Sequence, residues 1–128
     1  MRRHRPMSSA LIPPRTLTDL EISVATKLLS SDAPGATEYL AQVPYAQVVA
    51  TWGVGSPSID LSVRPGAVQA SDAPDGIFAC GAVTDRNGSP LGEVILWVEN
   101  GWLSGVEYAW YTDQRPHALP EPDRIELL

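Results

Sequence analysis

The chain has 128 residues, a length that suits one domain built around one hydrophobic core. Hydrophobic residues make up 44% of it and charged residues 19%, which is ordinary for a globular protein. The formal net charge of −6 argues against a nucleic acid or an anionic membrane surface as partner.

Residues 1–15 are expected to form a flexible arm, because the segment is rich in basic residues and proline. Its apolar stretch, residues 8–12, is too short for the core of a signal peptide. The longest uninterrupted apolar run, residues 94–98, is far below the length of a membrane span. Cys80 is the only cysteine, which excludes an intramolecular disulfide. The chain is therefore predicted to be soluble and cytoplasmic.

A first helix is predicted to begin near Thr16 or Thr18. Thr18 and Glu21 have the spacing of a capping box, in which each residue binds the backbone of the other. Apolar residues then recur at helical spacing, at Leu17, Leu20, Val24 and Leu28, with Ala25 beside them. This stripe predicts an amphipathic helix that packs on a core.

A short second helix is predicted over residues 36–42, where Tyr39 and Leu40 would point inward. It must end before Pro44, since the residue before a proline disfavours helical geometry. Strands are predicted over residues 46–52, 58–64 and 77–84, with a short edge strand over residues 124–128.

The predicted strand over residues 58–64 alternates apolar and polar side chains. Ile59, Leu61 and Val63 would face the core, and Ser58, Asp60 and Ser62 would face water. The loop that follows, residues 65–76, is long enough to be functional.

Residues 91–111 are predicted to form the central hairpin of the sheet. Asn100-Gly101 lies between two runs of β-branched and aromatic residues, the strongest short-range signal for a type I′ turn. A β-bulge at Ser104-Gly105 then aligns an apolar face made of Val94, Leu96, Val98, Leu103, Val106, Tyr108 and Trp110. The opposite face carries Glu93, Ile95, Trp97, Glu99, Trp102, Glu107 and Tyr111.

Together these elements predict an α+β fold. One or two N-terminal helices would pack on an antiparallel sheet of about five strands, arranged as a meander around the Asn-Gly hairpin. The predicted domain spans residues 16–128.

No motif indicates catalysis, a cofactor or a metal. Cys80 lies within a predicted strand, while His4 and His117 lie in the arm and in a proline-rich loop, so a buried, inert cysteine is favoured over a thiolate–imidazole pair. Residues 53–55 resemble a phosphate loop, but a strand follows them instead of a helix. Residues 85–88 resemble the start of a calcium loop that lacks its later acidic ligand. A non-enzymatic protein is therefore favoured over an enzyme.

The candidate binding residues are Trp97, Glu99, Trp102 and Glu107. The two tryptophans would cover roughly 300–500 Å², which is also the size of an ordinary monomer's largest apolar patch. Two interpretations stay open: the tryptophans contact a partner, or the C-terminal segment folds over them as a second core. Trp102, nearest the turn, is expected to be the more exposed. Acid–base catalysis by Glu93, Glu99 and Glu107 is less favoured, since ordinary solvated glutamates explain them.

Four segments follow one another in a characteristic order: residues 32–36 (DAPGA), 53–61 (GVGSPSIDL), 96–104 (LWVENGWLS) and 119–123 (LPEPD). In this order they resemble a family of uncharacterised small actinobacterial proteins with no assigned activity. The resemblance spans most of residues 17–126 and implies a fold more than a function. Members of that family have cysteines near the Gly53–Pro57 turn, where this chain has Thr51, Val54 and Gly55, so no metal site is carried over.

The sequence thus predicts a non-enzymatic binding or interaction protein. A more specific form is an antitoxin- or immunity-like protein, whose acidic Trp/Glu face would occlude a basic protein partner. The alternative is a small-molecule-binding protein or enzyme that uses the loop over residues 65–76 as a lid. A deep polar pocket beside that loop would favour the alternative. The sequence carries no signal for an oligomeric state.

Overall fold

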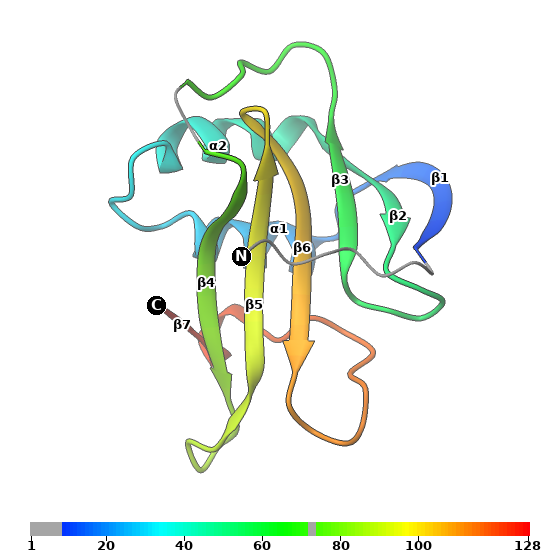
Figure 1. The fold of residues 1–128 in the computed structure, drawn as a ribbon, viewed down its shortest axis with the longest axis vertical. Helices are drawn as coiled ribbons and strands as arrows, with labels where there is room; N and C mark the ends of the chain where they lie inside the picture. Colours follow the sequence, from blue (N-terminus) through cyan, green and yellow to red (C-terminus); the bar gives the residue numbers. More distant parts are fainter. Residues whose placement is uncertain (1–8, 72–73) are drawn as a thin grey trace.

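The computed structural model describes residues 9–71 and 74–128 (Figure 1). One antiparallel sheet has the strand order β1-β2-β3-β6-β5-β4-β7. Its strands are β1 (Ala10–Thr16), β2 (Ala46–Thr51), β3 (Ile59–Val63), β4 (Gly76–Thr84), β5 (Pro90–Glu99), β6 (Trp102–Trp110) and β7 (Ile125–Leu127). Helices α1 (Asp19–Leu28) and α2 (Ala36–Gln42) both lie behind this sheet in Figure 1. The predicted mixture of N-terminal helices and an antiparallel sheet is confirmed.

The sheet departs from the prediction in its size and its topology. It has seven strands instead of about five, and it is not one meander. β1-β2-β3 and β4-β5-β6 are separate meanders, which pairing between β3 and β6 joins through Ile59↔Val106 and Asp60↔Gly105. This pairing links residues far apart in the sequence, so no local sequence pattern predicts it.

Residues 10–15 belong to strand β1, so the prediction of a structureless arm is wrong for them. Arg15 pairs with Val48 of β2, and the register shifts between Leu11 and Arg15, where Pro13 and Pro14 lie. Proline lacks the N–H that a central strand needs, but an edge strand such as β1 tolerates it. Ser9 belongs to no helix or strand, and residues 1–8 of the predicted arm lie outside the described residues.

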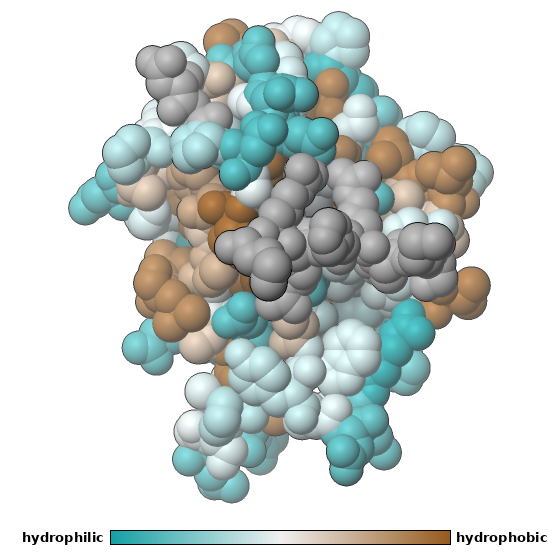
Figure 2. Space-filling model, in the orientation of Figure 1, coloured by the Kyte–Doolittle hydropathy of each residue, from teal (hydrophilic) through white to brown (hydrophobic). Residues whose placement is uncertain are grey.

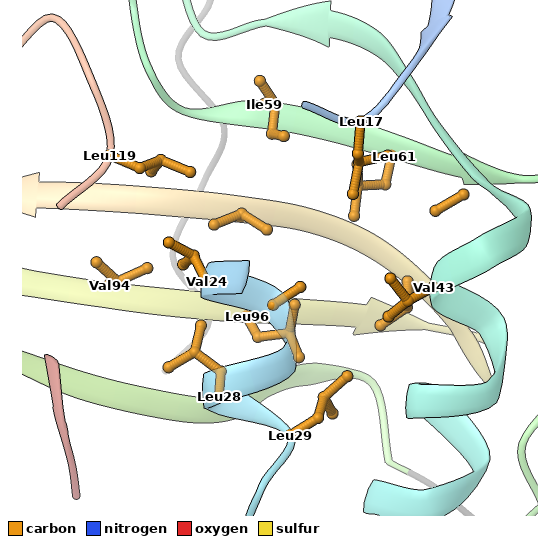
Figure 3. Packing of buried hydrophobic residues seen from close by; sticks show 14 of the residues in the cluster. Leu17, Val24, Leu28, Leu29, Val43, Ile59, Leu61, Val94, Leu96 and Leu119 are labelled. Carbon is orange, nitrogen blue, oxygen red and sulfur yellow. The ribbon is translucent and has the colours of Figure 1, made fainter. Parts of the chain in front are cut away.

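Helix α1 has the predicted start and the predicted buried face. The backbone N–H of Glu21 donates to Thr18 Oγ1 (3.1 Å), and the Glu21 carboxylate accepts from the backbone N–H of Thr18 (2.8 Å). This capping box satisfies two N–H groups that a helix start otherwise leaves unpaired. Val24, Ala25 and Leu28 are fully buried, and Figure 3 shows Val24 and Leu28 on the side of α1 that faces the sheet.

Helix α2 has the predicted bounds but a different inward face. Tyr39 is fully buried and packs edge-on against Phe78, with the ring centroids 4.9 Å apart. Leu40, predicted to point inward, is 38% exposed, and Gln42 is buried instead. Residues three apart share a helix face while adjacent residues do not, so burying Tyr39 favours Gln42 over Leu40.

The β5–β6 hairpin has the predicted turn and bulge. Asn100 and Gly101 have positive φ angles of 53° and 79°, and Glu99 pairs with Trp102. The register shifts by one residue at the predicted position, because Val98 pairs with Leu103 and Trp97 with Gly105. The core includes Val94, Leu96, Val98, Leu103, Val106 and Tyr108. Trp110, predicted on the same face, is 41% exposed at the strand end.

The main core lies between this sheet face and the two helices (Figure 3). Leu119 and Ile125 of the C-terminal segment belong to it as well. The predicted edge strand at the C-terminus is β7, which pairs with β4.

Candidate binding face

The sheet face away from α1 and α2, here named the front face, is turned toward the viewer in Figure 1. Across it, Asp60 of β3 pairs with Gly105 of β6, which pairs with Trp97 of β5. Two residues further along the same strands, Glu107 of β6 pairs with Ile95 of β5. Figure 2 shows the molecule from this side, with hydrophilic side chains over its lower part and apolar ones at its lateral margins. The register therefore brings acidic and aromatic side chains of three strands together.

Trp97 and Glu107, both predicted as binding residues, are in direct contact. The indole Nε1–H of Trp97 donates to Glu107 Oε1 at 3.1 Å. Trp97 is 8% exposed and Glu107 is 6% exposed. A carboxylate so far removed from water is costly unless it is hydrogen-bonded, and the indole N–H provides one such bond in a fixed direction.

A second pair of the same kind was not predicted. Trp52, just after β2, donates from Nε1 to Asp60 Oδ1 at 3.1 Å. Asp60 is 7% exposed, so its predicted position toward water is wrong. Ser58, also predicted toward water, is buried because its Oγ accepts the backbone N–H of Tyr108 (2.9 Å). Apolar–polar alternation identified the two faces of β3 but not what the polar face contacts.

The other two predicted binding residues, Glu99 and Trp102, face each other across the two strands beside the turn. Both are half-buried. Trp102 is more exposed than Trp97, as predicted for the residue nearest the turn. Because β5 is regular over this stretch, Trp97 and Glu99 point to the same face, and the four predicted residues therefore share the front face.

The C-terminal segment does not cover the tryptophans. Its apolar residues Leu119 and Ile125 belong to the core on the opposite side of the sheet, and β7 extends the sheet beyond β4. The interpretation of Trp97 and Trp102 as a second core under the C-terminus is therefore wrong.

The loop over residues 65–76 supports the hairpin tip. Its Ala70 donates a backbone N–H to the Gly101 carbonyl (2.9 Å), and its Asp75 carboxylate accepts the backbone N–H of Asn100 (2.8 Å). These bonds hold the described parts of the loop against a turn, which gives no support to the idea of a lid.

Cys80 lies within β4, where it pairs with Ile95 and is half-buried. His117 lines a cleft beside Arg15, and His4 lies outside the described residues. Within residues 9–71 and 74–128, no group of three or more His, Cys, Asp or Glu side chains is arranged to hold a metal ion. In the same part of the chain no helix has the length and apolarity needed to cross a bilayer.

Comparisons with known protein families, with curated protein sequences and with solved structures find no match. The resemblance to the actinobacterial family thus stays a prediction.

Proposed function

We propose that the protein is a non-enzymatic binding protein whose front face takes a cationic segment of a partner protein. The observation that carries this proposal is the pair of buried carboxylates, Asp60 and Glu107, each held by an indole N–H. Glu93 and Glu99 lie on the same face of β5. No strand from β2 to β6 contains a lysine, arginine or histidine, so this part of the sheet is purely acidic.

An arginine side chain fits this arrangement best. A guanidinium can bind a carboxylate with two parallel hydrogen bonds and stack on an indole ring at the same time. The indole N–H bonds hold the carboxylates in place before binding, which lowers the entropy lost on association. The net charge of −6 would also speed the encounter with a basic partner.

An antitoxin- or immunity-like role is the narrower form of this proposal, in which the partner is a basic toxin that the acidic face occludes. A small-molecule site or enzyme built on the loop over residues 65–76 has less support, because that loop is hydrogen-bonded to the hairpin tip.

Titration with arginine-rich and lysine-rich peptides of equal length, followed by tryptophan fluorescence, tests the proposal. We expect the arginine peptide to bind more tightly, and binding to weaken as ionic strength rises. The measurement uses the full chain and a chain without residues 1–8, because Arg2, Arg3 and Arg5 are themselves cationic and could compete with the peptide.

Two variants locate the binding. Glu107→Gln keeps an acceptor for the Trp97 indole but removes the charge, and we expect affinity to fall about tenfold. Trp102→Ser should cost about 2 kcal/mol of binding energy, as truncation of an interfacial tryptophan often does, and change stability little. Glu121→Gln, in an exposed loop away from the sheet, is the matched charge control.

A stability control separates binding from folding. Val98→Ala, in the core on the opposite face, should destabilise the fold and leave affinity unchanged. If Glu107→Gln and Trp102→Ser bind the arginine peptide as tightly as Glu121→Gln does, the front face is not the binding site.

A further inference from the structure

A cleft of about 240 Å³ lies at the other side of the molecule from the hairpin tip. It forms where β1, the start of α1, the turn between β2 and β3 and residues 117–119 meet. No residue of the loop over residues 65–76 is among its described lining residues, so this cleft does not support a small-molecule site built on that loop. Figure 3 shows two of its apolar wall residues, Ile59 and Leu119, on the side of the sheet that α1 covers.

The polar wall is built around an ion pair between Arg15 and Glu21. Arg15 donates from Nη1 to Glu21 Oε1 (2.8 Å) and from Nη2 to Glu21 Oε2 (2.9 Å). Burial by itself would raise the pKa of Glu21, but the hydrogen bonds from Arg15 and Thr18 outweigh it and lower that pKa. Glu21 is therefore a fixed carboxylate that orients the guanidinium.

Arg15 has donors left over after this pairing. Its Nη1 makes a second bond, to the Thr16 carbonyl (3.0 Å), so both Nη1 hydrogens are used. The Nε–H and the second Nη2–H have no acceptor within the described residues. By the planar geometry of the guanidinium, these two hydrogens lie along one edge and can together bind one carboxylate.

Two further donors line the same cleft. Ser56 Oγ accepts the backbone N–H of Ser58 (3.1 Å), which leaves its own hydrogen able to donate. The His117 imidazole carries at least one N–H in either tautomer and lies in an exposed segment. We propose that this cleft binds a small monocarboxylic acid, with its carboxylate on the open edge of Arg15 and within reach of Ser56 and His117.

The charges and the lining select this class of ligand. The Glu21 carboxylate offsets the charge of Arg15, so charge alone gives any anion little net attraction, and phosphate, which has no apolar part, gains nothing from the walls of the cleft. The apolar walls accept a hydrocarbon body, and they consist of Leu20, Pro57, Ile59, Ala118 and Leu119. The volume is below that of ordinary drug-sized pockets, so the ligand has fewer than about ten non-hydrogen atoms.

Benzoate is a suitable probe because it pairs a carboxylate with an apolar ring. In nuclear magnetic resonance titrations of the full chain, benzoate should shift the Arg15 Nε–H signal and the backbone amides of Ser56 and His117 in a saturable way. Benzamide, which has the same shape without the charge, and inorganic phosphate should each bind at least about tenfold more weakly.

Three variants separate binding in this cleft from other effects. Arg15→Lys retains the charge but loses the second edge, and benzoate affinity should fall at least about tenfold. Ala118→Phe leaves the Arg15–Glu21 pair intact and fills the cleft, and it should abolish the shifts. Glu107→Gln, on the front face, should leave benzoate binding unchanged, so this site and the proposed partner site fail or succeed separately.

The proposal is overturned if benzoate produces no saturable shift at Arg15. It is also overturned if benzamide binds as tightly as benzoate, or if Ala118→Phe binds benzoate like the wild-type chain.

Discussion

Replacement of Gln42 by methionine should destabilise the fold more than any other single change of a polar side chain near the hairpin tip. Gln42 is fully buried at the end of α2. Its Nε2 donates to the carbonyls of Val68 (3.0 Å) and Gly101 (2.9 Å), and its Oε1 accepts the backbone N–H of Leu103 (3.0 Å). One amide thus connects a helix, a loop and the central hairpin.

The expected loss of stability follows from the hydrogen bonds that each backbone partner of Gln42 keeps or loses after the substitution. The Gly101 carbonyl keeps the N–H of Ala70, and Val68 is 79% exposed, so water can reach its carbonyl. Leu103 is 2% exposed, and its N–H would lose its acceptor, which costs about 1–3 kcal/mol. The two carbonyls lose less, and the added apolar surface of methionine partly offsets these losses. Gln42→Met should therefore lower the free energy of unfolding by roughly 2–3 kcal/mol.

Urea unfolding followed by tryptophan fluorescence measures this difference. Gln47→Met is the matched control, because Gln47 is half-buried on β2 and its side chain makes no hydrogen bond to the described residues. This variant should stay within about 0.5 kcal/mol of the wild-type chain. Gln42→Glu adds a pH test. The buried carboxyl would face two carbonyl oxygens, which raises its pKa, so this variant should lose stability as pH rises above about 4.3. A Gln42→Met variant as stable as Gln47→Met would refute the reasoning.

Two further predictions concern side chains behind the sheet. Tyr39 is buried with a hydroxyl that has no hydrogen-bond partner within the described residues, and burial, with Asp75 and Glu38 nearby, raises its pKa. Tyr39→Phe should therefore keep the free energy of unfolding or raise it by up to about 1 kcal/mol, and a larger loss in urea unfolding would contradict this. The pKa of Glu21 is lowered in the folded state, so its charge adds stability above the ordinary glutamate pKa of about 4.3 and loses it as pH falls through the lowered value. Glu21→Gln should cost about 1–2 kcal/mol at pH 7, since Arg15 is 40% exposed, and this deficit should shrink in acid; an equal deficit at both pH values would argue against the ion pair.

Local sequence patterns are sufficient to predict the elements whose structure depends on residues close together in the chain. The capping box at Thr18, the bounds of α2 and the turn at Asn100-Gly101 all follow from interactions within a few residues. The bulge at Ser104 was predictable because only that register puts the apolar residues of β5 and β6 on one face.

Long-range pairing was not predictable in the same way. The pairing of β3 with β6 joins two meanders that the sequence separates by a long loop, and β1 was hidden by its two prolines. The same limit applies to the sites. Glu107 and Trp97 were placed on one face by the hairpin register, whereas contact between Trp52 and Asp60 depends on how the turn after β2 folds back.

Arg15 shows how local patterns can hide a site. The capping-box spacing predicts the role of Glu21 correctly, the proline-rich composition places Arg15 wrongly in an arm, and neither pattern links the two residues. The ion pair appears only once β1 is paired with β2 and leads directly into α1. A basic residue three positions before the first residue of a capping box, as Arg15 is before Thr18, is the signal that could have suggested it.

The buried polar groups on the two faces of the sheet differ in charge. Behind the sheet, the buried polar link at Gln42 is a neutral amide that bonds to three backbone groups. On the front face, Asp60 and Glu107 accept indole N–H bonds that a neutral asparagine or glutamine would accept equally well. A carboxylate costs more to remove from water than a neutral amide does, so the indole bonds alone do not account for the charge at these two positions. Under the proposed function, this charge attracts a cationic partner.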